Sequence, residues 1–354
     1  MTLANGQQLD GGRYTVEEQL GQGRFCITYL VKDRNDERFV IKTLNYDLPG
    51  LQTQSQVERD RLESKFLDEA VKLRGCSHPH IVKVERIFQQ DGKSYMVMEY
   101  LAGYSLAKRP QKIMVEEDAL RYIQQIADAL SYVHGQGVIH RDVKPGNIMI
   151  CDRSGNSEAI LIDFGLALDI NHDLTTARTQ EASEGYAPIE LYSSTGQKDN
   201  ISPATDVYSL AATLYNLLTG IKPASAVKLK IDNLSIVAPQ DFNSQISDRT
   251  NEAILSGLKL EPENRPESIQ VWLDSLKSSD LLEDNPTPPT PNPVPEENPE
   301  KINWAVVWAA VAAIGALLAG IGELSGFIDL FKSETNSDTN NSETSAPKTI
   351  DSAQ

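Results

Sequence analysis

The pattern of hydrophobic and polar positions separates an ordinary globular part of the chain from an unusual C-terminal part. Residues 14–19 alternate between polar and apolar side chains, and residues 38–42 form a short apolar run; both patterns are typical of β-strands. Residues 65–73 instead place apolar side chains at helical spacing. Runs of this kind, separated by Gly, Pro, Asn and Asp, continue over residues 14–277. We therefore expect one folded unit over that range.

The segment that follows is rich in proline and acidic residues. Residues 281–301 hold seven of the 18 prolines, with five acidic residues against one lysine. Proline has no N–H to donate to a helix or sheet, and the like charges repel each other. We therefore expect an extended acidic linker over residues 278–301.

An uncharged segment comes next, at residues 302–321. As a helix, at about 1.5 Å per residue, it would cover the roughly 30 Å hydrocarbon core of a bilayer. Trp304 and Trp308 lie near its start, where aromatic rings favour the headgroup region. A buried alanine-rich helix is the alternative, but the polar flanking segments offer no core to bury it. We expect one transmembrane helix at residues 302–322, then a short interfacial segment and a disordered tail at residues 323–354.

Composition and charge exclude several classes of protein. The chain has 354 residues, 40% of them hydrophobic, as in a globular protein with a core. Its 50 acidic and 33 basic side chains give a formal net charge of −17, which repels nucleic acid, so we expect no nucleic-acid partner. The three widely spaced cysteines indicate reduced thiols rather than disulfides. Residues 1–13 carry no charged-then-apolar leader, and we expect them to form an N-terminal extension.

A glycine-containing loop between two predicted strands is the first candidate binding site. It begins at Leu20, contains Gly21 and Gly23, and leads into the strand that carries Thr28. Glycines allow the backbone to close over a polyphosphate with its N–H groups facing the oxygens. Taken alone, this pattern is as typical of a plain hairpin turn.

A lysine and a glutamate further along could complete such a site. Lys42 ends the apolar run at residues 38–42, and Glu69 borders the apolar face of the predicted helix at residues 65–73. Lys42 would act as a phosphate clamp only if a carboxylate such as Glu69 holds it. The alternative for both residues is a solvated surface charge.

A polar loop between two β-branched runs carries the most specific pattern. Within residues 138–150 the chain places Asp142, Lys144 and Asn147 at fixed offsets, and Asp163 follows the next apolar run. Phosphoryl transfer to a hydroxyl needs a carboxylate to orient the nucleophile, a cation against the developing charge, and oxygen ligands for Mg²⁺. These four residues supply all three.

With these motifs in this order, residues 14–277 resemble the eukaryotic-type (Hanks-type) serine/threonine protein kinases. The resemblance implies an α+β fold with two lobes, a small antiparallel β lobe and a larger helical lobe. It implies transfer of the γ-phosphoryl group of ATP to Ser or Thr hydroxyls of protein substrates, with Mg²⁺ as the metal and Mn²⁺ as an alternative. Together with the single transmembrane helix that follows, the layout is similar to that of bacterial transmembrane kinases.

The resemblance also implies roles for single residues. Asp142 would be the base that orients the substrate hydroxyl, and Lys144 the cation near the transferred phosphoryl group. Asn147 and Asp163 would bind Mg²⁺, and Lys42 would hold the α- and β-phosphates. Lys42 would also pair with Glu69. The remaining ATP contacts that the family places on this sequence are Leu20, Gly21, Gly23, Thr28 and the backbone of Glu99 and Leu101.

Two further residue sets match the scaffold of the family. Glu190 and Arg265 match a buried ion pair, and Asp206 matches the helix aspartate that braces the catalytic loop. Arg141, before the catalytic aspartate, marks the class activated by phosphorylation of the activation loop. We expect Thr179 to be the main phosphosite, with Thr175 and Thr176 as alternatives.

The sequence departs from the family pattern at Cys26, Val40, Gly146 and residues 188–189. Cys26 replaces the third glycine of the loop, and Val40 replaces the alanine above adenine. Gly146 replaces an acid that reads substrate arginine, so a preference for basic sites has no support. For Cys26, an inert thiol is expected over the alternative, a redox brake on ATP binding.

These expectations place the protein in the cell membrane with one span and with the kinase domain in the cytoplasm, where ATP is. A homodimer is a further expectation, through the kinase domain or through the transmembrane helix, where Ala312, Ala316 and Gly320 form a small-residue stripe. Two rival functions stay open on the sequence. One is a membrane-anchored pseudokinase scaffold, and the other a small-molecule phosphotransferase with the same fold.

Overall fold

Two β-sheets and a group of helices make up the part of the chain that the computed structural model describes, which is residues 3–23, 26–47, 56–153, 155–163, 184–192 and 201–277. All of these residues belong to the first of two units, Met1–Glu283. The second unit, Asp284–Gln354, has no described residue.

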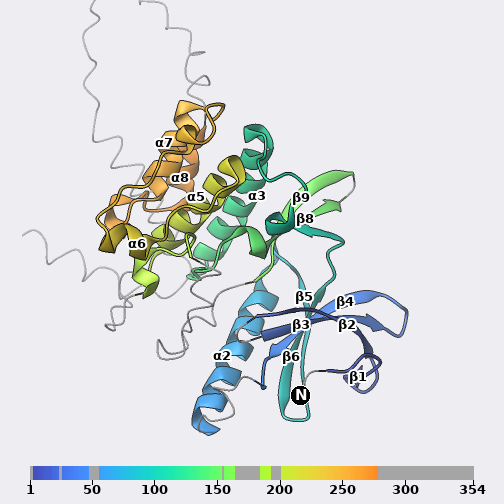
Figure 1. Cartoon of the computed structure of the whole chain (residues 1–354). Helices are drawn as coiled ribbons and strands as arrows, with labels where there is room; N and C mark the ends of the chain where they lie inside the picture. Colours follow the sequence, from blue (N-terminus) through green and yellow to red (C-terminus); the bar gives the residue numbers. More distant parts are fainter. Residues whose placement is uncertain are drawn as a thin grey trace, which may run out of the picture. The chain divides into compact units, whose positions relative to one another are not determined.

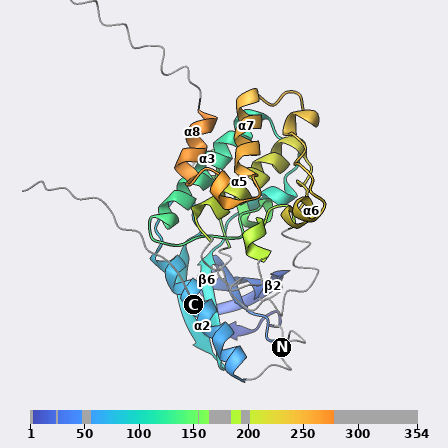
Figure 2. The ribbon, with the colours of Figure 1, turned by 90° about the vertical axis from the view of Figure 1, so that its left-hand side faces the viewer.

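The N-terminal lobe is a six-stranded sheet in which every neighbouring pair is antiparallel. One face buries a cluster that includes Tyr14, Ile41 and Val97, and the other face packs on helix α2 (Gln56–Gly75). Figure 2 shows α2 running alongside β6, with which it is in contact. The strands, in spatial order, are β1 (Gln8–Leu9), β2 (Tyr14–Gln22), β3 (Cys26–Asp33), β4 (Arg38–Leu44), β6 (Lys93–Glu99) and β5 (Val84–Gln90).

The first strand comes from the segment that the sequence predicts as an N-terminal extension. Leu9 pairs with Tyr14 and is fully buried. The backbone N–H of Leu3 donates to the Tyr29 hydroxyl at 3.2 Å. The described part of residues 1–13 is therefore attached to the sheet, and its apolar side chains contribute to the core.

The C-terminal lobe is built around α5 (Pro203–Thr219), a helix buried on all sides. Pro203 at its first position, a capping box formed by Ser202 and Thr205, and Gly220 in the left-handed conformation (φ 70°) define its ends. Figure 1 shows α3, α7 and α8 lying around this helix. The other helices are α3 (Glu116–His134), α6 (Ala226–Ile231), α7 (Asp248–Gly257) and α8 (Ile269–Leu276).

A small three-stranded sheet accompanies these helices, and two of the predicted site residues, Asn147 and Asp163, flank its strands. Its order is β7 (Gly103–Ser105), β8 (Ile148–Arg153) and β9 (Asn156–Leu161). The two-lobed α+β architecture expected from the sequence is thus confirmed. The short 3₁₀ turns are η1 (Leu106–Lys108), η2 (Pro145–Asn147), η5 (Ile189–Tyr192), η7 (Pro239–Asp241) and η8 (Pro262–Asn264).

The segments predicted beyond the globular part lie outside the described residues. They are the linker at residues 278–301, the transmembrane helix at 302–322 and the tail at 323–354. Within the residues that the structure does describe, none of the helices has the length and apolar character needed to cross a bilayer. The transmembrane helix therefore stays a prediction.

A buried ion pair joins η5 to the end of the helical lobe. Arg265 donates to both carboxylate oxygens of Glu190, at 2.7 and 2.9 Å, and their side chains are 0% and 3% exposed. The Thr205 hydroxyl also donates to Glu190, and Arg265 donates to the carbonyl oxygens of Lys259, Ala204 and Leu260. Both charges are therefore neutralised and extensively hydrogen-bonded, the condition under which a buried ion pair is tolerated.

Replacing Arg265 by Met should lower the free energy of unfolding by about 3–5 kcal/mol, because Glu190 would keep a buried charge without its cation. Urea unfolding measures the change. Arg38→Met, which breaks an exposed ion pair with Glu17, is the control and should cost less than about 1 kcal/mol. Equal losses in the two variants would contradict the assignment of Arg265 as a structural anchor.

Candidate active site

A buried lysine lies between two carboxylates from different elements. Lys42 is on β4, and its side chain is 8% exposed. Its ammonium donates to Glu69 Oε1 of α2 at 3.1 Å and to Asp163 Oδ1, two residues after β9, at 3.0 Å. Burial opposes the charge, but the carboxylates of Asp163 and Glu69 outweigh it and raise the pKa of Lys42 well above its usual value. The lysine therefore stays charged and holds three elements together.

The glycine-containing segment lies beside this lysine. Gly21 on β2 pairs with Thr28 on β3, and Thr28 in turn pairs with Lys42 on β4. The Thr28 hydroxyl donates to the Gly21 carbonyl at 3.3 Å, and the Gly23 N–H donates to the Cys26 carbonyl at 2.8 Å. The two strands predicted from the sequence are therefore present, and Thr28 lies beside Lys42 on the neighbouring strand. Leu20 is 45% exposed at the same end of β2.

Cys26 also faces this cluster. Burial raises the pKa of its thiol to about 12, against a smaller opposite effect of Lys42. Only the thiolate is a good nucleophile, and at neutral pH this thiol is protonated. The result favours the inert thiol over the redox brake.

The loop at residues 140–147 organises a second group of polar side chains. Lys144 donates to both carboxylate oxygens of Asp142, at 2.8 and 2.7 Å. The amide nitrogen of Asn147 donates to Asp142 Oδ2 and to the Asp142 carbonyl, both at 2.8 Å. The carboxylate of Asp142 is therefore held in one orientation by a cation and an amide.

Asn147 and Asp163 are brought to the same end of the β8–β9 hairpin. Ile148 pairs with Leu161, and the Ile162 N–H donates to the Asn147 carbonyl at 3.0 Å. With its nitrogen committed to Asp142, Asn147 would reach a cation through its amide oxygen. The described residues contain no group of three or more His, Cys, Asp or Glu side chains able to hold a metal. A cation here would take one amide oxygen, one carboxylate and ligands from outside the chain, a donor set that suits Mg²⁺.

Asp206 of α5 holds the loop at residues 140–147 by accepting hydrogen bonds from its backbone. Its two carboxylate oxygens accept the backbone N–H groups of His140 at 2.8 Å and Arg141 at 2.7 Å, and Nε2 of His134 lies 2.7 Å from Oδ2. Arg141 has φ 69°, a left-handed conformation that costs free energy in a residue other than glycine. The buried carboxylate therefore stabilises a strained turn one residue before Asp142.

His140 contributes through its ring as well. Burial lowers the pKa of His140, although Asp206 and Asp142 oppose the effect. The neutral ring keeps Nδ1 as an acceptor, and the Asp142 N–H donates to it at 3.2 Å. The backbone is thus held by hydrogen bonds on both sides of Arg141, at His140 and at Asp142.

The segment that joins the lobes carries Glu99 and Leu101, the two residues predicted to meet adenine through their backbone. Leu101 is buried, and the Glu99 N–H donates to the Lys83 carbonyl at 3.0 Å. The Glu99 carboxylate accepts from the Lys83 N–H at 2.9 Å and from Arg153 of β8 at 2.8 Å. Its side chain therefore links this segment to the C-terminal lobe.

The structure thus gathers Lys42, Glu69 and Asp163 into one hydrogen-bonded group and Asp142, Lys144 and Asn147 into another, joined by the β8–β9 hairpin. The other predicted residues that the structure describes belong to neither group. Two contributors were missed from the sequence, His134 beneath Asp206 and Arg153 beside Glu99. No local pattern distinguishes either from a surface residue. The expected phosphosites at residues 175, 176 and 179 lie outside the described residues.

Comparison with known proteins matches this geometry to one family. A family model described as a protein kinase domain matches residues 14–276. A probable serine/threonine-protein kinase of Clostridium acetobutylicum is 30% identical over 280 residues, 75% of this chain and 40% of the relative. The calcium/calmodulin-dependent protein kinase cmkA of Emericella nidulans is 30% identical over 62% of this chain and 54% of the relative. The chain therefore spans about half the length of these curated relatives or less.

Solved structures give the same result for the fold. The PpkA-294 apo form covers 78% of this chain and 99% of its own, with a TM-score of 0.64 and 25% identity. The PknI kinase domain of Mycobacterium tuberculosis, in a double-mutant form, covers 78% and 98%, with a TM-score of 0.59 and 24% identity. The second likeness supports the fold alone.

Replacing Asp206 by Asn should lower the free energy of unfolding by about 1–3 kcal/mol, because the amide nitrogen cannot accept one of the two backbone N–H groups. Urea unfolding measures the change. Asp274→Asn is the matched control, since that side chain is 56% exposed on α8, and it should stay within about 0.5 kcal/mol of the parent. If Asp206→Asn is as mild as this control, Asp206 does not brace the loop.

Proposed function

Because the chain belongs to the protein kinase domain family, we propose that it is an ATP-dependent serine/threonine protein kinase. The observation that carries the proposal is Lys42, buried and hydrogen-bonded to both Glu69 and Asp163. This arrangement places a permanent cation beside the carboxylate that would bind the metal. Such a pairing of cation and metal site is what the triphosphate of ATP requires.

The residues present fit bound Mg²⁺ and ATP. Lys42 would hold the α- and β-phosphates, and the glycine-containing segment with Gly21 and Gly23 would lie over them. Asn147 and Asp163 would hold Mg²⁺, or Mn²⁺ in its place. In the segment that joins the lobes, here called the hinge, the Glu99 N–H already donates to the Lys83 carbonyl. The carbonyl oxygen of Glu99 would therefore meet the adenine amino group, and the backbone of Leu101 would complete the contact. Mg²⁺-ATP bound here supplies the transferable γ-phosphoryl group.

Asp142 and Lys144 then account for transfer to a Ser or Thr hydroxyl of a protein. The carboxylate of Asp142, held by Lys144 and Asn147, would orient the hydroxyl and accept its proton. The ammonium of Lys144 would stabilise the negative charge that develops on the transferred group. Autophosphorylation of the activation loop, with Thr179 as the main site, belongs to the same proposal.

We further propose that the chain is a single-pass membrane protein with its kinase domain in the cytoplasm. The support is the uncharged segment at residues 302–321, which follows an acidic, proline-rich linker. Cytoplasmic ATP requires the kinase domain on that side. The small-residue stripe from Ala312 to Gly320 supports a homodimer through the span, and the kinase domain is the alternative contact.

A pseudokinase scaffold is the rival from another class. It is disfavoured because Lys42, Asp142, Asn147 and Asp163 are all present. Asn147 is hydrogen-bonded to Asp142, and Lys42 is hydrogen-bonded to Asp163. A small-molecule phosphotransferase is disfavoured by the Glu190–Arg265 pair, which matches the scaffold of protein kinases. Assay of transfer to protein distinguishes all three.

Asp142→Asn should lower the rate of phosphoryl transfer from γ-labelled ATP to generic protein substrates by about 10²–10⁴-fold, the usual contribution of a positioned acid or base. Labelling in the presence of Mg²⁺ measures it, and the wild-type chain should carry label within residues 163–190. Asp274→Asn serves as the control and should transfer at the parent rate. Removal of Mg²⁺ by a chelator should stop transfer, and added Mg²⁺ or Mn²⁺ should restore it. Equal labelling by Asp142→Asn and wild type would refute the catalytic assignment.

Expressed at full length, the chain should sediment with membranes and resist carbonate extraction. A variant with Ala312→Arg and Leu317→Arg should become extractable, because each arginine at the centre of a span costs about 2.5–3.5 kcal/mol. The control is Ser345→Arg, outside the span, which should sediment like wild type. A wild-type chain that stays in the soluble fraction would refute the membrane proposal.

A further inference from the structure

Tyr46 joins α2 to the sheet at a point separate from Lys42. Its hydroxyl donates to Glu63 Oε2 at 2.6 Å and accepts the backbone N–H of Ser94 at 3.3 Å. Tyr46 comes two residues after β4, Glu63 is in the first half of α2, and Ser94 is the second residue of β6. One hydroxyl therefore connects the helix to β6 and to the segment that leaves β4.

This contact and the Lys42–Glu69 pair connect the same parts of the lobe. Lys42 precedes Tyr46 by four residues, and Glu69 follows Glu63 by six. Six residues of α-helix correspond to about 9 Å along the axis and about 120° around it. A helix tied at one point can still turn about that point. Two ties, offset along and around the axis, fix both its rotation and its tilt.

Burial along α2 shows why the second tie is needed. The buried apolar residues of the helix begin at Leu62 and recur at Phe66, Ala70 and Leu73. Before Leu62 the described side chains of α2 are exposed, and Val57 is 76% exposed. The Tyr46 bond therefore acts at the first position where the helix meets the lobe.

The opposite end of α2 is anchored by the backbone. Just beyond the helix, the Val82 N–H donates to the Leu161 carbonyl, and the Leu161 N–H donates to the His80 carbonyl, both at 2.9 Å. These bonds join the segment after α2 to β9. A swing of α2 would thus be smallest at its C-terminal end and large at Glu63, where the Tyr46 hydroxyl holds it.

The carboxylate of Glu63 is not at its most favourable position. Its second oxygen, Oε1, is buried without a hydrogen-bond partner among the described residues, and an unsatisfied buried acceptor costs free energy. A rotation of α2 that brought this oxygen into contact with water would remove that cost. The short bond from Tyr46 to a charged acceptor, of the strong kind, opposes that turn.

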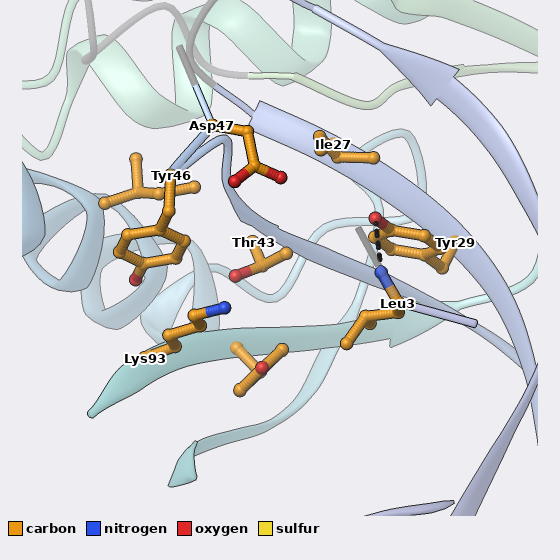
Figure 3. Close-up of a pocket in the computed structure, with 9 residues that line it drawn as sticks. Leu3, Ile27, Tyr29, Thr43, Tyr46, Asp47 and Lys93 are labelled. Carbon is orange, nitrogen blue, oxygen red and sulfur yellow. Dashed lines mark hydrogen bonds between the residues drawn. The ribbon is translucent and has the colours of Figure 1, made fainter. Parts of the chain in front are cut away.

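The surroundings keep Tyr46 a donor. Burial and the hydrogen bond to Glu63 raise the pKa of Tyr46, so its hydroxyl is neutral at physiological pH. The Lys93 ammonium lies 5.1 Å from the centre of the Tyr46 ring. Figure 3 shows Tyr46 and Lys93 on one side of a small pocket, with Tyr29 and Leu3 on the other side.

We propose that Tyr46 is a positioning residue for phosphoryl transfer, whose hydrogen bond to Glu63 fixes the rotation of α2 at which Glu69 reaches Lys42. The inference rests on the proposed kinase activity. Tyr46 acts through the helix: its effect is on the geometry of the Lys42–Glu69 pair, and the chemistry remains with Asp142 and Asp163.

Tyr46→Phe in the full chain removes the hydroxyl and keeps the ring. It should lower kcat/KM for ATP about tenfold, equivalent to about 1.4 kcal/mol. Tyr29→Phe is the matched control, because it removes a hydroxyl that accepts from the Leu3 N–H at the other side of the same pocket. That variant should keep kcat/KM within about twofold of the parent. Thermal unfolding of both variants checks that each is folded at the assay temperature.

Variants of Glu63 test the partner. Glu63→Gln keeps an oxygen that can accept from Tyr46 and should retain most of the activity. Glu63→Leu should lose as much as Tyr46→Phe, and the double variant should be no worse than either single variant, since all three lack the same contact. Additive losses in the double variant would mean that the two side chains act separately, and the proposal would fall.

Hydrogen exchange gives a readout that needs no catalysis. Amides of residues 62–73 in α2 should exchange about tenfold faster in Tyr46→Phe than in Tyr29→Phe. If the wild-type chain transfers no phosphate, the proposed function fails, and exchange alone decides whether Tyr46 holds the helix. The role of Tyr46 would be overturned if Tyr46→Phe had the same kcat/KM and the same amide exchange rates as the wild type. If Lys42→Met were inactive in the same assay, the kinase assignment would remain intact.

Discussion

A buried ammonium is the constraint on which the site depends. The Lys42 side chain is 8% exposed, and a charge removed from water is tolerated only when it is paired and hydrogen-bonded. Its partners, Glu69 and Asp163, are 27 and 121 residues away in sequence. β4 therefore reaches its final environment only when α2 and the end of β9 are both in place. The arrangement that would bind a metal nucleotide is the same one that neutralises this lysine.

In the C-terminal lobe, helix α5 holds two segments by hydrogen bonds, η5 and the loop at residues 140–147. Thr205 and Asp206 are neighbours on the fully buried α5. Thr205 donates to Glu190 of η5, and Asp206 accepts from the backbone around Arg141. Because α5 is packed on all sides, neither loop can move without disturbing the core. The strained conformation of Arg141 persists for this reason, and the orientation of Asp142 follows from it.

The residue pattern alone predicted local geometry, whereas the long-range pairs Lys42–Glu69 and Glu190–Arg265 were expected only from the family resemblance, and both are present in the structure. Asp142, Lys144 and Asn147 lie within six residues, so their types and offsets determine most of their geometry. The helix that carries Glu69 could be predicted from its apolar spacing. By contrast, the direct contact between Lys42 and Asp163, and the place of His134 beneath Asp206, depend on how distant elements pack. Strand β1 was missed because two residues, Gln8 and Leu9, carry no periodicity, and their pairing with β2 decides their conformation.

The link between the lobes determines how α2 can move. Behind the hinge, Arg153 of β8 donates to the Glu99 carboxylate at 2.8 Å and to the Pro79 carbonyl at 3.0 Å, and the segment after α2 is hydrogen-bonded to Leu161 of β9. The C-terminal end of α2 is therefore connected to the helical lobe as well as to its own sheet. A swing of α2 about that end, or a rotation of the helix about its axis, would change the distance between Glu69 and Lys42. Within the described residues, two side-chain bonds that resist such a movement are Lys42–Glu69 and Tyr46–Glu63. The first is made by the ammonium that would bind the phosphates, and the second by a neutral hydroxyl. The two bonds respond differently to their surroundings, because a bound nucleotide would compete for the ammonium of Lys42 while leaving the hydroxyl of Tyr46 on Glu63.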